Sequence, residues 1–170
     1  WDVVKKANPR AILVGISGSG QNGPSSDRVC FAPIAEAVSG LTYVTGGQGD
    51  TAPVRPNISL GDSVTGLNAF GMLLAAIYER DVGGTGQGRC IDIAMFESLF
   101  SMMDAAVTEY GALGAIRAPS ANTVVFSPSG SFMGRDGDWV YVTASGNAVF
   151  YRLEAAIGKP ELINDPRFVE

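Results

Sequence analysis

The sequence predicts an α/β fold, in which parallel strands are covered by apolar helices. Residues 11–17 form an almost continuous apolar run, which is typical of a strand buried on both faces in a parallel sheet. Residues 63–80 and 96–113 are long and apolar enough to form buried helices. Near residues 119–128 the composition changes, which indicates a boundary between two structural units.

The first strand is followed by a glycine-rich loop over residues 17–24, Ser-Gly-Ser-Gly-Gln-Asn-Gly-Pro. Such loops often hold phosphates, but this one matches neither the dinucleotide fingerprint nor the P-loop pattern. Taken alone, it indicates a plain loop. A short helix is expected next over residues 33–38, with Pro33 in its first turn and Gly40 after its end.

The main helix is expected over residues 63–80, because its large apolar side chains recur at helical spacing and alanines fill most other positions. Such a helix belongs in an interior or an interface. A glycine turn over residues 81–88 then leads to a short strand at 89–94 and to the second long helix at 96–113.

The last part of the chain has a different pattern. Residues 130–133 and 139–142 flank the turn sequence Gly-Arg-Asp-Gly-Asp, which predicts a β-hairpin. A helix is expected over about residues 148–157, where Gly158 and Pro160 end it.

Composition excludes several functions. The hydrophobic fraction is 46%, the charged fraction is 17% and the net charge is −5, without a basic tract, so sequence-independent nucleic-acid binding is disfavoured. The apolar surplus predicts that another segment or chain covers part of the surface. No uninterrupted apolar run has the length of a bilayer span and residues 1–6 do not form a signal peptide, so a soluble cytoplasmic protein is expected.

The chain contains no histidine, and Cys30 and Cys90 are its only cysteines. Two cysteines do not make a disulfide framework. The absence of histidine excludes Ser-His-Asp and Cys-His catalysis and the usual zinc sites within this chain. Chemistry here must therefore use carboxylates, hydroxyls, thiols, cations or backbone groups.

Asp62 is the candidate on which the prediction of function depends. It follows Gly61 at the start of the main helix, where unpaired N–H groups and the positive end of the helix dipole favour negative charge. Two interpretations fit this position: an N-cap residue, or a reactive carboxylate beside a site that stabilises an oxyanion. Position alone favours the N-cap.

Several short segments in a fixed order extend this picture. The segments are Asn-Pro-Arg at 8–10, the glycine-rich loop at 17–24, Ala-Glu-Ala-Val-Ser-Gly-Leu at 35–41, Gly-Asp at 61–62, Ala-Ala-Ile-Tyr-Glu-Arg at 75–80, Thr-Gly-Gln-Gly at 85–88, Ile-Asp-Ile at 91–93, Gly-Lys-Pro-Glu-Leu at 158–162 and Asp-Pro-Arg-Phe at 165–168. Together they resemble family III CoA-transferases of the CaiB/BaiF type, the group that contains formyl-CoA transferase, carnitine CoA-transferase and the 2-methylacyl-CoA racemases. The resemblance runs from about residue 8 to residue 168.

This resemblance implies a domain organisation. Members of the family are longer than this chain, which is similar to their central section. Residues 1–118 then correspond to the central part of a Rossmann-like large domain that includes the catalytic aspartate. Residues 119–170 correspond to a linker and the start of a smaller α+β domain, with the hairpin and a helix. The family forms interlocked homodimers, so a homodimer is expected.

The resemblance also places the catalytic aspartate of the family on Asp62. Its implied chemistry moves CoA from an acyl-CoA thioester to a free carboxylic acid through mixed-anhydride and aspartyl-CoA thioester intermediates. Acyl-CoA and a small carboxylic acid are then the partners. CoA is a substrate, and neither a prosthetic group nor a metal is expected.

Five consecutive residues fall where family members contact CoA: Arg28, Val29, Cys30, Phe31 and Ala32. Arg28 suits a phosphate contact, although a solvated loop arginine is an equal alternative. Related racemases carry a proton-shuttling histidine at the position of Phe31, which favours transfer over racemisation. Many family members carry an aspartate at the position of Ala32.

Three hypotheses therefore remain: a CoA-transferase, a 2-methylacyl-CoA racemase or epimerase, and an inactive CoA-binding fragment. The other carboxylates have structural interpretations. Glu36 and Glu79 are expected to be solvated or paired, Asp92 to form a structural hydrogen bond, and Asp104 to be paired or interfacial.

Overall fold

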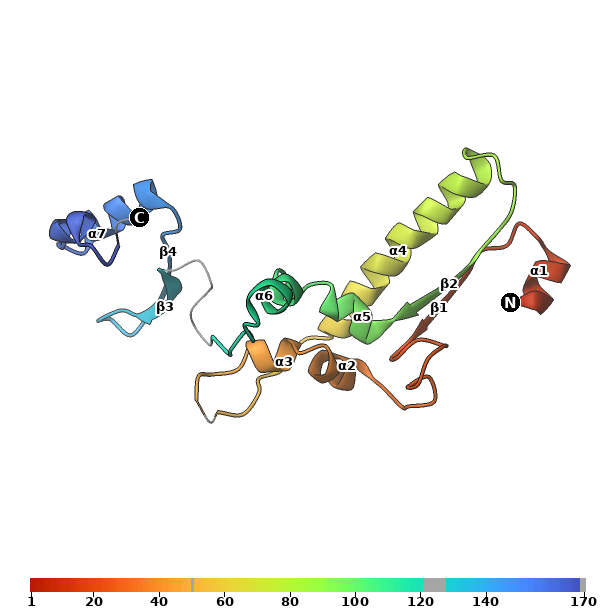
Figure 1. The fold of residues 1–170 in the computed structure, drawn as a ribbon, viewed down its shortest axis with the longest axis horizontal. Helices are drawn as coiled ribbons and strands as arrows, with labels where there is room; N and C mark the ends of the chain where they lie inside the picture. The colour runs from red at the N-terminus through yellow and green to blue at the C-terminus, as the bar shows by residue number, and fades with distance from the viewer. Residues whose placement is uncertain (50, 121–127, 169–170) are drawn as a thin grey trace. The chain divides into compact units, whose positions relative to one another are not determined.

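The computed structural model describes residues 1–49, 51–120 and 128–168. The chain divides into two compact units (Figure 1), one formed by Trp1–Gly46 and Thr51–Pro119 and the other by Gly47–Asp50 and Ser120–Glu170. The linker expected after residue 118 falls mainly on residues 121–127, which lie outside the described residues. Assigning the two units to a large and a small domain stays a prediction.

The first unit contains the predicted parallel strand pair. Strand β1 (Leu13–Ser17) pairs with β2 (Cys90–Ala94), from Leu13 opposite Cys90 to Ser17 opposite Ala94. The chain enters β2 through Gly88, whose N–H donates to the Pro9 carbonyl at 2.7 Å. A Cβ at Gly88 would lie 1.7 Å from the Ala11 carbonyl oxygen, so only glycine fits this crossing.

Helix α4 (Leu60–Asp81) runs alongside this strand pair (Figure 1). It is the main helix of the prediction, but it begins three residues earlier than expected. The helices of the first unit are α1 (Asp2–Ala7), α2 (Ala32–Val38), α3 (Leu41–Val44), α4 (Leu60–Asp81), α5 (Met95–Phe100) and α6 (Ala106–Leu113).

The prediction of one long helix over residues 96–113 is wrong. The chain leaves helical geometry between α5 and α6, where Asp104 adopts a left-handed backbone with φ of 48°. Arg117 holds this turn, because it donates to the Met103 carbonyl at 3.2 Å, pairs with Glu109 at 2.6 Å and lies 3.9 Å from the Asp104 carboxylate. Apolar composition alone did not reveal the break, since both helices are apolar.

The buried core of the first unit lies where α2, α4 and α5 meet. Its buried members are two alanines, which allow the helices to approach closely, and two larger apolar side chains. They are Ala32, Ala35, Met95 and Leu99, with Cys30, Leu41, Leu60, Val64 and Phe96 packed against them.

Much of α4 beyond this core remains exposed, including the large apolar side chains of Leu67, Phe70 and Tyr78. Among the helices of the described residues, α4 alone is long and apolar enough to cross a membrane, by length and composition only. It packs in this structure against α2, α5 and both strands of the first sheet. A core helix of an α/β unit passes the same test, so this property does not indicate a membrane protein.

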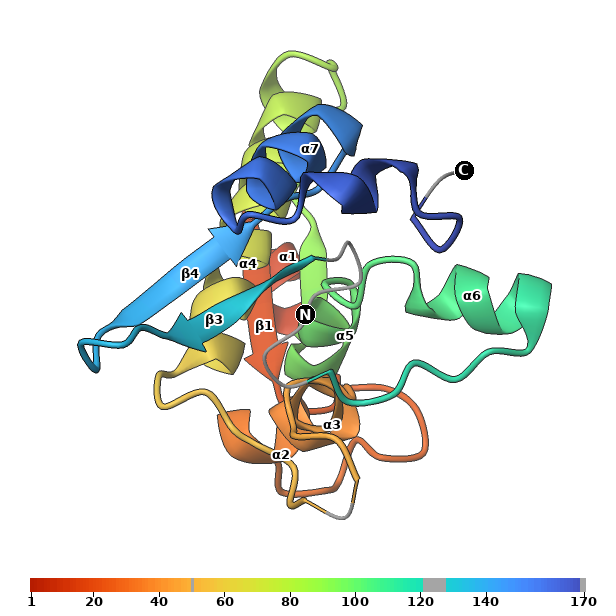
Figure 2. The same ribbon diagram turned by 90° about the vertical axis from the view of Figure 1, so that its left-hand side faces the viewer.

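The second unit contains the predicted hairpin. Strands β3 (Ser129–Met133) and β4 (Trp139–Thr143) are antiparallel, and Figure 2 shows them side by side. The helix α7 (Asn147–Ala156) follows, and then the short 3-10 helix η1 (Pro160–Asn164). The α7 boundaries differ from the predicted ones by one residue at each end.

Candidate functional site

The first turn of α4 positions Asp62. The helix has Ser59 as its N-cap residue, without a capping side-chain hydrogen bond, and Asp62 is its third residue. The N-cap interpretation of Asp62 is therefore wrong, because the helix starts earlier than apolar periodicity alone suggested. A carboxylate in the first turn still interacts favourably with the helix dipole.

Gly61, directly before Asp62, is buried in the core. A Cβ at this position would lie 3.1 Å from Ala32 Cβ and 3.2 Å from Met95 Sδ. The backbone of the first turn of α4 therefore packs directly on α2 and α5. Glycine allows this approach, and the approach fixes where the helix begins.

Both polar groups of the Gly61 backbone are also held. The Gly61 N–H donates to Glu36 Oε1 at 3.2 Å, and the Gly61 carbonyl accepts from the Thr65 hydroxyl at 2.6 Å. The other oxygen of Glu36 accepts from Arg55 Nε at 2.7 Å. Glu36 is thus paired, one of the two states expected for it, and it is completely buried rather than solvated.

The Asp62 carboxylate itself is free. It is exposed, and it has no side-chain hydrogen bond or ion pair with any residue in 1–49, 51–120 or 128–168. Neighbouring N–H groups are used, since Leu60 donates to Ile58, Gly61 to Glu36 and Ser63 to Ser59. The Asp62 N–H has no acceptor outside α4 among the described residues, so this donor is available to a bound group.

The glycine-rich loop packs against the chain around residue 30. A Cβ at Gly18 would lie 2.2 Å from Cys30 Cβ, so this glycine permits direct contact. The Gln21 N–H donates to Asp92 Oδ2 at 2.8 Å, and the Phe96 N–H donates to the Gly18 carbonyl at 3.2 Å. Asp92 therefore has the structural role expected for it, because it ties the loop to the middle of β2.

This packing leaves a cavity of about 490 Å³, called the loop cavity below. Three of the predicted CoA contacts line it: Arg28, Val29 and Cys30. The other two do not. Phe31 is 70% exposed beside it, as the N-cap residue of α2, and Ala32 is 5% exposed in the core. The remaining lining residues are Ser19, Asn22, Gly23, Pro24, Ser25, Ile34, Val38, Phe96 and Glu97.

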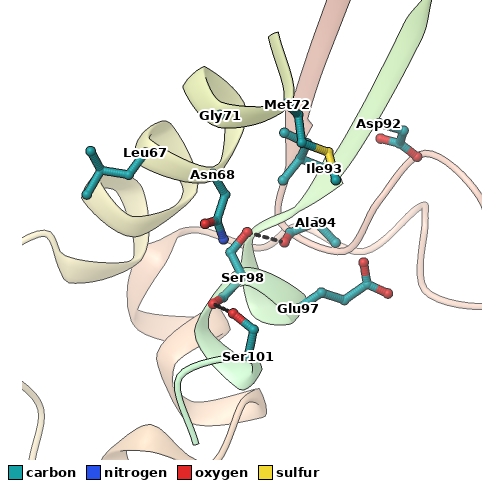
Figure 3. Close-up of a pocket in the computed structure, with 10 residues that line it drawn as sticks. All are labelled: Leu67, Asn68, Gly71, Met72, Asp92, Ile93, Ala94, Glu97, Ser98 and Ser101. Carbon is teal, nitrogen blue, oxygen red and sulfur yellow. Dashed lines mark hydrogen bonds between the residues drawn. The ribbon is translucent and has the colours of Figure 1, made fainter. Parts of the chain in front are cut away.

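A second cavity of about 520 Å³, the helix cavity, lies between α4, β2 and α5. Figure 3 shows its lining, in which Ser98 donates to the Ala94 carbonyl at 3.2 Å. Glu97 on α5 and Asp92 on β2 both belong to this lining. Glu97 lines both cavities, so the two adjoin at this residue. Asp62 lines neither of them.

Sequence reasoning did not single out Glu97 or assign a function to Ser98. The sequence did indicate where such residues would lie, because ligands in α/β sheets bind outside the carboxyl ends of parallel strands. Ser17 and Ala94 end the two strands side by side, and α5 starts directly after Ala94. In the described part of the chain, no group of three or more Cys, Asp or Glu side chains could hold a metal ion.

Comparison with known proteins agrees with this fold. The sequence profile of CoA-transferase family III matches residues 1–170. The chain belongs to CoA-transferase family III. This confirms the family resemblance that the ordered motifs predicted.

Two curated relatives illustrate the match. Succinyl-CoA–D-citramalate CoA-transferase of Chloroflexus aurantiacus is 36% identical over 99% of this chain and 41% of its own length. Succinyl-CoA:glutarate CoA-transferase of Homo sapiens is 32% identical over 99% of this chain and 38% of its own length. The chain thus spans about two fifths of the length of the curated relatives it matches.

Solved structures show the same fold. A CAIB/BAIF family protein from Brucella suis is 25% identical, with a TM-score of 0.79 over 99% of this chain and 44% of that one. A hypothetical protein, Rv3272, from Mycobacterium tuberculosis is 21% identical, with a TM-score of 0.80 over 100% of this chain and 44% of that one, and it supports the fold alone. The predicted α/β class is confirmed, as part of a larger domain.

Proposed function

We propose that this chain supplies the nucleophile of an acyl-CoA:carboxylate CoA-transferase, and that the nucleophile is Asp62. One observation carries the proposal. The Asp62 carboxylate is exposed and without a partner among the described residues, while the backbone before it is held by packing and by hydrogen bonds on both sides. A carboxylate that stabilised the fold through an ion pair or a side-chain hydrogen bond would have such a partner.

The proposed reaction needs no proton transfer. An Asp62 oxygen attacks the thioester carbonyl carbon, the C–S bond breaks, and its electron pair leaves on sulfur, which gives CoA thiolate and a mixed anhydride. The thiolate then attacks the aspartyl carbonyl carbon and releases the original acid as a carboxylate, which leaves an aspartyl-CoA thioester. An incoming carboxylate reverses the two steps, and the cycle restores free Asp62.

The first turn of α4 suits the charge that develops in these steps. Each attack on the aspartyl carbonyl forms an oxyanion beside the helix N-terminus. The free Asp62 N–H and the positive end of the dipole are positioned to stabilise that charge. The helix dipole also stabilises the carboxylate of free Asp62. The reaction is therefore accelerated only if a hydrogen-bond donor points at the oxyanion.

We assign the loop cavity to part of the CoA substrate. Arg28 supplies a guanidinium for charge-assisted hydrogen bonds to a phosphate, while Val29 and Cys30 provide apolar contact. Phe31, exposed beside the cavity, adds an apolar surface. Ala32 contributes through the core, since its side chain packs beneath Gly61. CoA enters as a substrate, without a prosthetic group or a metal.

The relatives guide the choice of test substrates. The names of the two curated relatives above pair succinyl-CoA with D-citramalate in one enzyme and with glutarate in the other. We therefore propose succinyl-CoA as the first donor to test. Because the chain spans about two fifths of those relatives, residues beyond it are expected to complete the site. An interlocked homodimer and a cytoplasmic location also stay predictions.

Trapping the intermediate tests the proposal. The natural full-length protein is incubated with succinyl-CoA and then with hydroxylamine, and peptide mass spectrometry is expected to find a hydroxamate at Asp62. Asp62→Asn is expected to abolish both adduct and CoA transfer. Asp2→Asn, which changes a carboxylate in the first turn of α1, serves as the matched control and is expected to retain both.

The contrary outcomes separate the alternatives. Absence of an adduct with several acyl-CoA donors contradicts the transferase assignment and favours a non-catalytic CoA-binding role. Exchange of the substrate α-proton with solvent deuterium, without transfer, would instead indicate a racemase. Phe31 argues against that result, because its side chain cannot move a proton.

A further inference from the structure

A buried carboxylate lies directly behind the proposed nucleophile, and the transfer steps do not use it. Glu36 on α2 is 0% exposed. Burial of an ionised carboxylate is costly unless it is paired and hydrogen-bonded. A buried carboxylate beside a core of apolar side chains points to a role beyond filling space.

The partners of Glu36 come from two different parts of the chain. Arg55, in the segment between α3 and α4, donates through Nε to Oε2 at 2.7 Å, and its side chain is 40% exposed. The Gly61 N–H donates to Oε1 at 3.2 Å. One carboxylate therefore connects α2, the segment before α4, and the first turn of α4. These three residues are called the Glu36 anchor below.

The anchor acts on the residue next to Asp62. The Asp62 side chain has no hydrogen bond or ion pair with the described residues, so the backbone largely decides where its carboxylate lies. The Glu36 carboxylate accepts a hydrogen bond from the Gly61 N–H, and the Thr65 hydroxyl donates to the Gly61 carbonyl. Ala32 and Met95 pack against the Gly61 Cα. The first turn of α4 therefore has little freedom to shift or rotate.

The anchor also selects which N–H remains free. Because the Gly61 donor is used by Glu36, the Asp62 N–H is the unused donor of this turn in the described part of the chain. Loss of the Glu36 carboxylate would leave the Gly61 N–H without its acceptor inside the core. The turn would then have to shift to satisfy that N–H, and Asp62 would move with it.

We propose that Glu36, supported by Arg55, is a positioning residue for nucleophilic attack by Asp62. This inference rests on the proposed function of Asp62. Glu36 does not touch the reacting atoms. It fixes the backbone from which the nucleophile extends, so its loss lowers the rate of covalent chemistry rather than the affinity for acyl-CoA.

The test compares two substitutions of Glu36 in the natural full-length protein. Glu36→Leu keeps most of the volume but removes both acceptors, and kcat is expected to fall about 10- to 100-fold, since misplacement of a reacting group by about 1 Å costs roughly 100-fold. KM for succinyl-CoA is expected to stay within about twofold, because uniform binding is not affected. Glu36→Gln retains one carbonyl oxygen for the Gly61 N–H and is expected to recover most of kcat.

Adduct formation and a control complete the design. The rate of hydroxamate formation at Asp62 is expected to fall in parallel with kcat in Glu36→Leu. Glu79→Gln changes a carboxylate that pairs with Arg89 near the other end of α4, and it is expected to leave kcat and KM unchanged. Circular dichroism and Tm establish that each variant is folded.

Each outcome decides between the readings. A folded Glu36→Leu protein with wild-type kcat overturns the inference, whereas reduced kcat with unchanged KM and recovery in Glu36→Gln supports it. If Glu36→Leu does not fold, Arg55→Met decides, because it removes the half-exposed partner and is expected to lower kcat at unchanged KM; wild-type kcat there overturns the inference. If the wild-type protein itself gives no adduct, the proposed function fails, and this inference fails with it.

Discussion

Gly88→Ala should be one of the most damaging single-methyl additions in this chain. The added Cβ would lie 1.7 Å from the Ala11 carbonyl oxygen and 2.5 Å from the Ala11 carbonyl carbon. Both are backbone atoms, so no side-chain rotation relieves the overlap. The crossing segments must separate by more than 1 Å, since non-bonded carbon and oxygen atoms rest at roughly 3.3 Å or more.

The expected cost follows from what that separation breaks. The Gly88–Pro9 hydrogen bond of 2.7 Å and the Leu13–Arg89 hydrogen bond of 2.9 Å both lie at this crossing. Their loss costs about 1 kcal/mol each, and forced repacking adds about 1 to 3 kcal/mol. Reduced freedom of the unfolded chain offsets about 0.4 to 1 kcal/mol. Gly88→Ala should therefore lower the free energy of unfolding by about 2 to 5 kcal/mol.

Urea unfolding of the natural full-length protein, followed by circular dichroism, measures this difference. Gly66→Ala is the matched control, because Gly66 lies inside α4 and a Cβ there meets no atom within 4 Å. That control should gain up to about 1 kcal/mol from helix propensity. Equal stability of the Gly88→Ala variant and the wild-type protein would refute the assigned crossing of the segments before β1 and β2.

Two carboxyl groups give further predictions from pH. Hydrogen bonding by Arg80, and then by Arg10, lowers the pKa of Asp81 from 3.8 to about 2, so its contribution is present above pH 3.8 and is lost as the pH falls towards 2. In the Asp81→Asn variant, the urea concentration at the midpoint of unfolding should therefore change less between pH 4 and pH 2 than in the wild-type protein. An equal change in both proteins would contradict this pairing. Burial, with the charge of Glu161, raises the pKa of Glu154 above 4.5, and its carboxylate oxygens have no hydrogen-bond partner among the described residues. The protonated Glu154 carboxyl group contributes stability below pH 4.5, and this contribution is lost as the pH rises through the raised pKa. Glu154→Gln should therefore be more stable than the wild-type protein at pH 7 but not at pH 4. An equal difference in the free energy of unfolding at both pH values would argue against a buried, unpaired carboxyl group.

Local patterns predicted the strands and the hairpin well. The continuous apolar run before Ser17 and the turn between Met133 and Trp139 specify their structures within a few residues. Helix boundaries that depend on tertiary contacts were predicted less accurately. Helix α4 starts at Leu60 because Gly61 packs on α2 and α5, and helical periodicity does not contain that information.

In the candidate site too, local sequence patterns predicted one part, and the rest depends on tertiary contacts. Asp62 was identifiable from a glycine before an apolar helix, together with the order of the family motifs. The partners of Glu36 were not, because Arg55 lies 19 residues away and Gly61 lies 25 residues away. A glutamate in a short helix has the same local pattern whether it is solvated or buried. Three-dimensional contacts alone distinguish the two states.

The parallel pairing of β1 with β2 has a consequence for how the chain folds. The hydrogen bond between Gln21 and Asp92, a residue in the middle of β2, joins residues 71 positions apart. Closing so long a loop is entropically costly and slow. The 22-residue α4 spans about 33 Å as a rigid rod and removes much of that freedom once it forms. Early formation of α4 on α2 should therefore precede strand pairing, and the turn that carries Asp62 should be ordered before the sheet that it accompanies.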